Sequence, residues 1–523
     1  MSIPIGREGL AQILRLSAAA LLIAAAPGCG LRQTLHTGAG HKAKALASGV
    51  FVSGRAADRV IRDDLSDGPM VLVSGRVDAE ERSASARALG LVRSKAICRV
   101  GLGCTLVEEL TEEEIRSQPY DPPPVSTIDP AELPWPSGDA LPDGPPQTGI
   151  DLAKLDAALD EVFSEPAGPG KRETRAVVVV HRGRIVAERY AGGFDAGTPL
   201  PGWSMTKGVM GALVGIRVRE GALDLHAPAP VPEWRGEDDP RAAITLDQLL
   251  RMSSGLEFGE ATDAYDADLA TMLFDRGDAA AYAAAKPLAH PPDTHWHYSS
   301  GTANIVSRIV RHSFEDDRAA HFSFPRRALF DRIGMRSAVI EPDASGSFVG
   351  SSFMFATARD WARFGLLFLN DGVWEGERIL PEGWVEYSTT PTPRAPQGRY
   401  GAHWWLNAGE PDDPGDRPWP DLPTDTFSTR GHEGQEVVVI PSRELVLVRL
   451  GQSRPESSYD SNGFGAAVLA CISHQLATAA ADSTASSRPS PSGRLDVLPS
   501  TPSASSGPRA ANLRHFRRPA TGR

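Results

Sequence analysis

The sequence predicts a mixed α/β (α+β) fold built around an antiparallel sheet. Residues 174–192 (TRAVVVVHRGRIVAERYAG) form two β-rich runs about a polar turn, which is the pattern of a hairpin. Residues 435–451 (QEVVVIPSRELVLVRLG) form a second β-rich hairpin pattern. Residues 152–163 and the apolar stretch that begins near Ser204 have the periodicity of helices. Because a hairpin joins antiparallel strands, we expect the sheet to be antiparallel.

The composition is that of a globular protein and excludes two functional classes. The chain has 523 residues, of which 41% are hydrophobic and 23% are charged, as expected for a protein with a substantial core. Its 66 acidic and 54 basic residues give a net charge of -12, which argues against a nucleic-acid-binding protein. Only 4 cysteines in this length exclude a scaffold built from disulfides.

The first 28 residues have the features of an export signal. Arg7 and Arg15 precede an uncharged apolar run over residues 16–26, which is shorter than the roughly 20 residues of a membrane span. The run ends in Ala-Pro-Gly-Cys, which resembles the lipobox of bacterial lipoproteins and makes Cys29 a candidate lipidation site. An ordinary cleaved signal followed by a chance cysteine is the alternative. We expect an exported protein that is periplasmic or attached to a bacterial envelope membrane through a lipid on Cys29.

The other end of the chain is predicted to be disordered. Residues 477–523 are rich in Ala, Ser, Thr and Pro and contain few large apolar residues that could form a core. Four arginines give this tail a basic end: Arg514, Arg517, Arg518 and Arg523. They indicate either attachment to an anionic surface or simply a solvated tail.

Residues 29–149 form an N-terminal accessory region that contains no catalytic constellation. Residues 51–65 predict a strand followed by a helix, and residues 95–107 predict two short strands around a glycine turn. Cys98 and Cys104 flank that turn and are candidates for a disulfide, with two free thiols as the alternative. The Pro-rich residues 117–147 predict an extended strap. We expect this region to pack against the following domain or to shape its entrance.

Residues 150–476 are the predicted catalytic domain, with Ser204 as its candidate nucleophile. Ser204 and Lys207 form a Ser-x-x-Lys pattern at the start of an apolar helix, where a spacing of three places both side chains on one face. A serine hydroxyl needs a base to become a good nucleophile. A lysine can be that base when burial lowers its pKa. The N-terminus of the helix also offers N–H groups to a developing oxyanion.

These motifs resemble the serine β-lactamase and penicillin-binding-protein superfamily. The likeness is strongest to its class C-like branch, which includes esterases, D-aminopeptidases and 6-aminohexanoate-dimer hydrolases. Residues 244–258 (ITLDQLLRMSSGLEF) and residues 356–385 resemble further segments of that branch. The resemblance implies a β-lactamase/transpeptidase-like fold, with an antiparallel sheet flanked by helices and a helical subdomain. It covers approximately residues 150–476.

The resemblance also implies a second proton-transfer group. Tyr298-Ser299-Ser300 stands where the family has Tyr-x-Asn, so Tyr298 is expected to share protons with Lys207 and to protonate the leaving group. Ser300 replaces the usual Asn, as it does in esterase and amidase relatives. Tyr298 is expected to lie in the helical subdomain.

The third family motif, Lys-Thr-Gly, is matched to His432-Glu433-Gly434. The resemblance then implies that the N–H groups of Ser204 and Gln435 form the oxyanion hole. Gly434 is expected to allow close approach of the substrate, and His432 to hydrogen-bond either Tyr298 or the substrate. A carboxylate at Glu433, if it points inward, would repel the anionic group of a β-lactam or a D-Ala-D-Ala peptide.

The sequence therefore favours a serine hydrolase that cleaves an ester or a linear amide through an acyl-enzyme. A β-lactamase or D-Ala-D-Ala peptidase, and a non-catalytic penicillin-binding receptor, are the alternatives. Trp404 and Trp405 either line the acyl pocket or belong to the core. His290, His295 and His297 lack a metal-binding pattern, so we expect neither a metal nor another cofactor. The expected partner is a small ester or amide substrate, and the oligomeric state is not indicated.

Overall fold

A computed structural model describes residues 28–122, 129–142, 144, 149–236, 238–262 and 264–472 of the chain. The predicted export signal and the predicted disordered tail therefore lie outside the described residues. The same holds for the side chain of Cys29, whose backbone belongs to the first helix. Among the helices that are described, none is long and apolar enough to cross a membrane.

The central sheet is antiparallel throughout, as the hairpin patterns predict. Its six strands follow the order β12-β13-β14-β15-β5-β6. Their bounds are β5 Thr174–His181, β6 Arg184–Tyr190, β12 Trp405–Leu406, β13 Phe427–Gly431, β14 Gln435–Ile440 and β15 Leu445–Gly451. The sheet pairs β15 with β5, for example Val448 with Val178. The two predicted hairpins therefore lie side by side, with β6 as an edge strand of the sheet.

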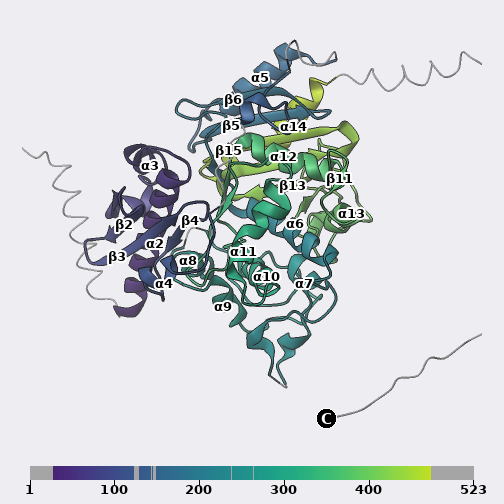
Figure 1. The fold of residues 1–523 in the computed structure, drawn as a ribbon. Coiled ribbons are helices and arrows are strands. Elements are labelled where there is room, and N and C mark those ends of the chain that lie inside the picture. The colour runs from purple at the N-terminus through teal and green to yellow at the C-terminus, as the bar shows by residue number, and fades with distance from the viewer. Residues whose placement is uncertain are drawn as a thin grey trace, which may run out of the picture. The chain divides into compact units, whose positions relative to one another are not determined.

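Helices cover both faces of this sheet (Figure 1). The valines of β5 alternate between two cores, with Val178 and Val180 in the larger one and Val177 and Val179 in the smaller one. On the larger-core side lie α6 (Thr206–Arg219) and α12 (Ala358–Leu369). On the other side lie α5 (Leu152–Phe163) and α14 (Ser461–Ala470). A strand that is buried on both faces needs apolar residues at consecutive positions, which explains the unbroken valine run.

A helical region follows α6 in the chain. It contains α7 (Leu246–Leu250), α8 (Asp268–Phe274), α9 (Ala279–Ala284), α10 (Ser300–His312) and α11 (Arg318–Pro325). Smaller elements complete the domain: β7 (Leu200–Pro201), β8 (Val339–Ile340) and β9 (Met354–Ala356) form a small sheet, β10 (Val373–Trp374) pairs with β11 (Glu377–Arg378), and α13 is Trp384–Thr389. Ser299 caps the N-terminus of α10 through a hydrogen bond to the N–H of Thr302. That cap places Tyr298 immediately before a well-defined helix start.

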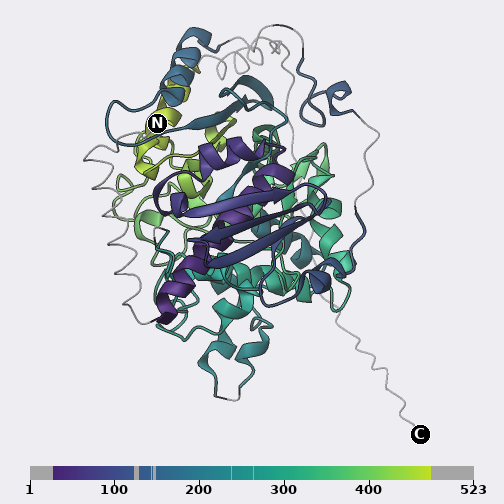
Figure 2. The same ribbon diagram turned by 90° about the vertical axis from the view of Figure 1, so that its left-hand side faces the viewer.

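The N-terminal region forms its own small α/β unit, which Figure 2 brings to the front. Helix α2 (Gly28–Phe51) packs on a four-stranded antiparallel sheet of β1 (Val73–Asp78), β2 (Ser83–Ala88), β3 (Val92–Arg99) and β4 (Gly103–Leu106). The contact is made largely by alanines of the helix and of β2. Two short helices, α3 (Ala57–Asp64) and α4 (Glu112–Arg116), complete the unit.

Two details of this unit bear on the sequence-based expectations. The predicted strand at residues 51–65 is wrong, because Phe51 ends helix α2, whereas the helix predicted after it is present as α3. Cys98 and Cys104 face each other across β3 and β4 and form a disulfide. The described part of the Pro-rich strap is held by Arg363 of α12, whose guanidinium donates to the carbonyls of Pro136 and Gly138.

Candidate active site

Ser204 lies in a single 3-10 turn, Trp203–Met205, that leads directly into α6. The preceding residue, Trp203, has φ of 48°, the left-handed region that non-glycine residues rarely adopt. Such local strain needs support from surrounding contacts. Here the N–H of Gly202 donates to the carbonyl of Met354 at 2.8 Å, which ties the turn to β9. The hydroxyl of Ser204 is thereby presented at the N-terminal end of the helix.

Lys207 is buried and directed at Ser204. Its Nζ donates to Ser204 Oγ at 2.9 Å, to Ser300 Oγ at 3.1 Å and to the carbonyl of Ser351 at 3.0 Å. Burial lowers the pKa of Lys207 to about 8, while the carboxylate of Glu260 works in the opposite direction. At this pKa about a tenth of the lysine is uncharged at pH 7, and only this uncharged form can accept a proton as a general base.

Tyr298 lies on the other side of the nucleophile. Lys207 Nζ is 4.8 Å from the centroid of its ring, and its phenol interacts with the hydroxyl of Ser204. Burial, and then the nearby Glu260 carboxylate, raise the pKa of Tyr298 above its ordinary value. The resting side chain is therefore a protonated phenol, which can donate a proton but not accept one.

Glu260 completes this group, although it is not among the candidates that the sequence predicts. Its carboxylate accepts hydrogen bonds from the N–H and from Oγ of Ser300, the latter at 3.1 Å. Burial raises the pKa of Glu260, and the charge of Lys207 opposes that rise. A chain of contacts therefore runs from Ser204 through Lys207 and Ser300 to Glu260. The available signal was an acidic residue at the end of the family-like segment GLEFGE.

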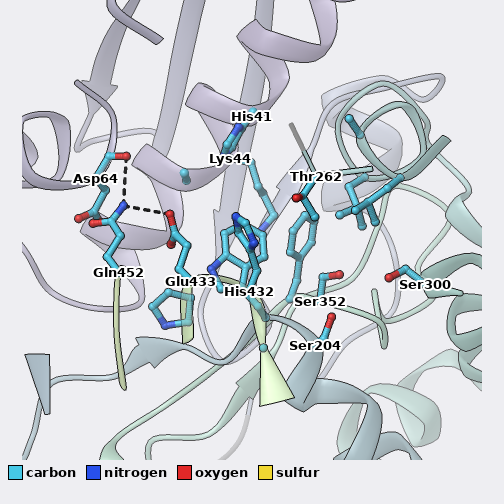
Figure 3. Close-up of a pocket in the computed structure, with 18 of the residues that line it drawn as sticks. His41, Lys44, Asp64, Ser204, Thr262, Ser300, Ser352, His432, Glu433 and Gln452 are labelled. Carbon is cyan, nitrogen blue, oxygen red and sulfur yellow. Dashed lines mark hydrogen bonds between the residues drawn. The ribbon is translucent and has the colours of Figure 1, made fainter. Parts of the chain in front are cut away.

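The site opens into one large cavity of about 660 Å³. Ser204, Glu260, Tyr298 and Ser300 line it, together with residues of β13 and the turn that follows. Residues of the N-terminal unit line it as well, including His41 and Lys44 of α2, which lie across the cavity from Ser204 in Figure 3. The expectation that the accessory region shapes the entrance therefore agrees with the fold.

The sequence profile of the family described as "Beta-lactamase" matches residues 159–471. The chain belongs to the β-lactamase family. This match spans the central sheet, the nucleophile turn and the helical region, so the protein is a β-lactamase-fold hydrolase and its fold is β-lactamase/transpeptidase-like.

Three known proteins are similar to this chain. A 6-aminohexanoate-dimer hydrolase of Paenarthrobacter ureafaciens is 25% identical over 332 residues, covering 58% of this chain and 79% of the relative. A solved β-lactamase from Mycobacterium bovis is 18% identical, with a TM-score of 0.43 and coverage of 60% and 98% of the two chains. A solved family VIII carboxylesterase is 17% identical, with a TM-score of 0.45 and coverage of 63% and 99%.

The third motif of the β-lactamase family has two possible matches in this structure. A Cβ atom on Gly431 would lie 2.1 Å from the carbonyl oxygen of Gly202, so the backbone of β13 meets the nucleophile turn at Gly431. Gly431 and His432 line the cavity, whereas Gln435 is buried and its side chain bonds Gly451. A Cβ on Gly434 would instead meet Arg449 at 2.7 Å.

The remaining predicted residues divide between the cavity and the core. His432 Nδ1 lies 2.7 Å from Glu456 and does not bond Tyr298 in the described contacts. Burial works to lower the pKa of His432, but the hydrogen bond to Glu456 and the charge of Glu433 outweigh it, so the pKa is raised. Glu433 does line the cavity, yet Arg454 Nε donates to it at 2.7 Å. The expected repulsion of anionic substrates is therefore largely cancelled.

The two tryptophans have different environments. Trp404 is a core residue, fully buried and stacked on Phe364 with ring centroids 5.9 Å apart. Trp405 lines the cavity and lies 5.3 Å from the ring of Tyr298. Trp405 is the first residue of β12, and Trp404 immediately precedes that strand. Of the three histidines near Tyr298, His290 and His295 stack on each other, and His297 bonds the carbonyl of Phe258.

Proposed function

We propose that this protein is a serine hydrolase that cleaves an ester or a linear amide through an acyl-enzyme on Ser204. The observation that carries the proposal is the 2.9 Å contact between Lys207 Nζ and Ser204 Oγ at the floor of a large cavity. A buried lysine with a pKa of about 8 is suited to remove the serine proton. The family and the cavity agree with small-molecule hydrolysis.

The first step is attack on the substrate carbonyl. Neutral Lys207 accepts the proton of Ser204, and Oγ forms a bond to the carbonyl carbon while the carbonyl π electrons move to oxygen. The resulting ammonium is held by Ser300 Oγ and the carbonyl of Ser351, and its charge is balanced by Glu260 behind Ser300. Glu260 and Ser300 act as positioning residues for Lys207.

The oxyanion requires two N–H donors, and the N–H of Ser204 at the start of α6 is the first. For the second donor we propose the N–H of His432 in place of that of Gln435. Support comes from the contact of Gly431 with the nucleophile turn and from the position of His432 on the cavity wall. The third motif would then be Thr429-Arg430-Gly431.

Collapse of the tetrahedral intermediate breaks the bond to the leaving group. Tyr298 is the proposed proton donor, because its raised pKa keeps the phenol protonated at neutral pH. The proton on Lys207 can replace the one that Tyr298 gives up, since the two side chains flank Ser204. In deacylation, neutral Lys207 takes a proton from water as the water oxygen attacks the acyl carbon, and that proton passes to Ser204 Oγ when the ester bond breaks.

The amide that this proposal favours is linear rather than cyclic. The named activity of the Paenarthrobacter ureafaciens relative is the reason to place linear amides beside esters. β-Lactams remain the competing substrate, because Arg454 neutralises the carboxylate of Glu433 that had argued against them.

A substrate panel tests the proposal. We expect hydrolysis of p-nitrophenyl butyrate and of a linear 6-aminohexanoate dimer, and weaker turnover of nitrocefin. Ser204→Ala should abolish hydrolysis, whereas Ser66→Ala, the same change at an exposed serine of the N-terminal unit, should retain it. Full activity of Ser204→Ala, or nitrocefin turnover above that of the ester, would refute the proposal. A stable acyl adduct without product release, seen by mass spectrometry, would instead indicate a penicillin-binding receptor.

We also propose, from the sequence alone, that the protein is exported and lipidated on Cys29. Metabolic labelling with a fatty acid should mark the wild-type protein and should not mark Cys29→Ala. Labelling that persists in Cys29→Ala would exclude this site.

A further inference from the structure

Helix α2 forms the wall of the cavity opposite Ser204. Five of its residues line that wall, on one face of the helix: His41, Lys44, Ala45, Ser48 and Gly49. In Figure 3 this helix crosses the cavity on the far side from Ser204, with His432 and Thr262 between them. A substrate held at Ser204 therefore extends toward residues that lie outside the part of the chain matched to the β-lactamase family.

The space between α2 and α8 is lined by apolar side chains. Helix α8 contributes Leu269, Ala270, Leu273 and Phe274 to the cavity, and Phe353 adds a second ring. The ring of His41 stacks on Phe274, with centroids 4.5 Å apart and planes 18° apart, and Phe274 lies 5.9 Å from Phe353. These contacts form a continuous aromatic surface behind the small side chain of Ala45.

The polar groups of this wall carry little free charge. Lys44 is paired with Glu341 and lies 4.0 Å from the centroid of Phe353. Burial lowers the pKa of His41 to about 4, so its ring is neutral at physiological pH, and its Nδ1 lies 3.2 Å from the hydroxyl of Tyr265. An uncharged group meets no electrostatic penalty here, whereas an ion would lose hydration without gaining a partner.

Other parts of the same cavity have the opposite character. Arg55, Asp64, Arg175, Glu433 and Arg454 line it, and they are joined by ion pairs. Figure 3 places Asp64, Glu433 and Gln452 together, apart from Ser204 and Ser300. The cavity thus has an apolar section between α2 and α8 and a charged section beside α3.

The apolar section is held rigidly in place. A Cβ atom on Gly40 would lie 2.1 Å from the carbonyl oxygen of Phe274, so α2 and α8 touch at their backbones. His36 Nδ1 lies 2.6 Å from Asp275, and Lys44 and Ser48 both bond Glu341. A site that is already ordered loses little conformational entropy when a ligand binds.

We propose that the α2–α8 wall is a subsite for an uncharged hydrocarbon segment of the substrate. This inference rests on the proposed function, because the segment is carried by the ester or amide that Ser204 attacks. The N-terminal unit is therefore part of the substrate-binding site, with Ala45 as a specificity-determining residue. Burial of each methylene contributes enough free energy to raise kcat/KM about fourfold until the section is full.

Two series of linear esters test the subsite. One series varies the acyl chain of p-nitrophenyl esters from acetate to decanoate, and the other varies the alcohol of n-alkyl acetates. We expect kcat/KM to rise with chain length in one series and then to level or fall. The series that responds tells whether the hydrocarbon belongs to the acyl group or to the leaving group.

The matched variant is Ala45→Phe, which places a ring in the apolar section. We expect the ratio of kcat/KM for the longest favoured ester to that for the acetate to fall at least tenfold. Ala153→Phe, the same change at an exposed position of α5, should leave this ratio unchanged. If Ala45→Phe does not fold, Ala45→Leu offers a smaller side chain with high helix propensity and should lower the ratio severalfold.

Two results would overturn the subsite while leaving the proposed function intact. One is a flat chain-length dependence in both series with hydrolysis that still requires Ser204. The other is an equal loss of kcat/KM for short and long esters in the folded Ala45 variants. Failure of the proposed function looks different, because hydrolysis would then be absent or would persist in Ser204→Ala.

Discussion

Two buried lysines lie on opposite sides of one cavity, and their environments differ: Lys44 lines the cavity, whereas Lys207 contacts Ser204 at its wall. Lys207 contacts the hydroxyls of Ser204 and Ser300 and a carbonyl oxygen, and its nearest carboxylate, Glu260, lies behind Ser300. Lys44 of α2 contacts the carboxylate of Glu341 directly. Burial lowers the pKa of both amines, and a carboxylate opposes this fall at each of them: Glu260 at Lys207, and Glu341 at Lys44.

The comparison teaches that burial alone does not make a lysine a base. Neutral oxygens around Lys207 leave its uncharged form available, whereas a direct carboxylate partner makes Lys44 one half of an ion pair. Glu341 also accepts from Ser48 and from the N–H of Cys104, so this pair joins α2, β4 and the catalytic domain. The same residue type therefore contacts the hydroxyl of Ser204 on one side of the cavity and anchors α2 on the other.

Of these variants, Lys207→Met should have the largest effect, which is a loss of activity. Removal of a general base typically lowers the rate about 10²- to 10⁴-fold, so we expect kcat/KM for p-nitrophenyl butyrate to fall within that range. Lys154→Met, at an exposed position of α5, is the control and should be silent. Substantial activity in Lys207→Met would remove the distinction between the two lysines.

Lys44→Met should instead act on stability. It leaves the carboxylate of Glu341 buried without its cation, a change that typically costs about 3–5 kcal/mol of unfolding free energy. Chemical denaturation measures the loss. The double variant Lys44→Met, Glu341→Gln removes the charge but keeps an acceptor for Ser48 and Cys104, so it should recover much of that stability. If Lys44→Met leaves the unfolding free energy unchanged, the Lys44–Glu341 ion pair does not stabilise the position of α2.

Glu260→Gln should change the pH dependence of kcat/KM by changing the pKa of Lys207. Activity requires neutral Lys207, so kcat/KM should rise with pH through about 8. Because the charge of Glu260 raises the pKa of Lys207, its removal should move this rising limb to lower pH. The control Glu257→Gln, at an exposed position in the same loop, should not shift the rising limb of the pH profile. An unmoved limb in Glu260→Gln would contradict electrostatic coupling.

His36→Gln, in the N-terminal half of α2, should give the smallest effect. The hydrogen bond to Asp275 raises the pKa of His36, burial opposes this, and Glu108 adds to the rise. A raised folded-state pKa stabilises the protein below the ordinary pKa of histidine, and the contribution is lost as pH rises through the raised value. Tm should therefore differ between wild type and variant at pH 5.5 and converge at pH 8.5, with the exposed His226→Gln as control.

Much of the catalytic domain could be predicted because local patterns survive in the fold. The valine run of β5 and the spacing of Ser204 and Lys207 each report a geometry set within a few residues. Helix α2 could not be predicted in the same way. Its sequence contains several glycines and little amphipathic periodicity, so its stability comes from tertiary packing on β2 and β3 rather than from propensity.

The sequence by itself determined the antiparallel hairpins and the closeness of Lys207 to Ser204, since these depend on strand and helix periods. Only the tertiary structure decided that Glu260 stands behind Ser300, that Arg454 neutralises Glu433 and that α2 closes the cavity. It also separated Trp405 at the cavity from Trp404 in the core. Each of these results joins residues that are distant in the chain or depends on which side chain packs in the core, and no local pattern encodes such a contact.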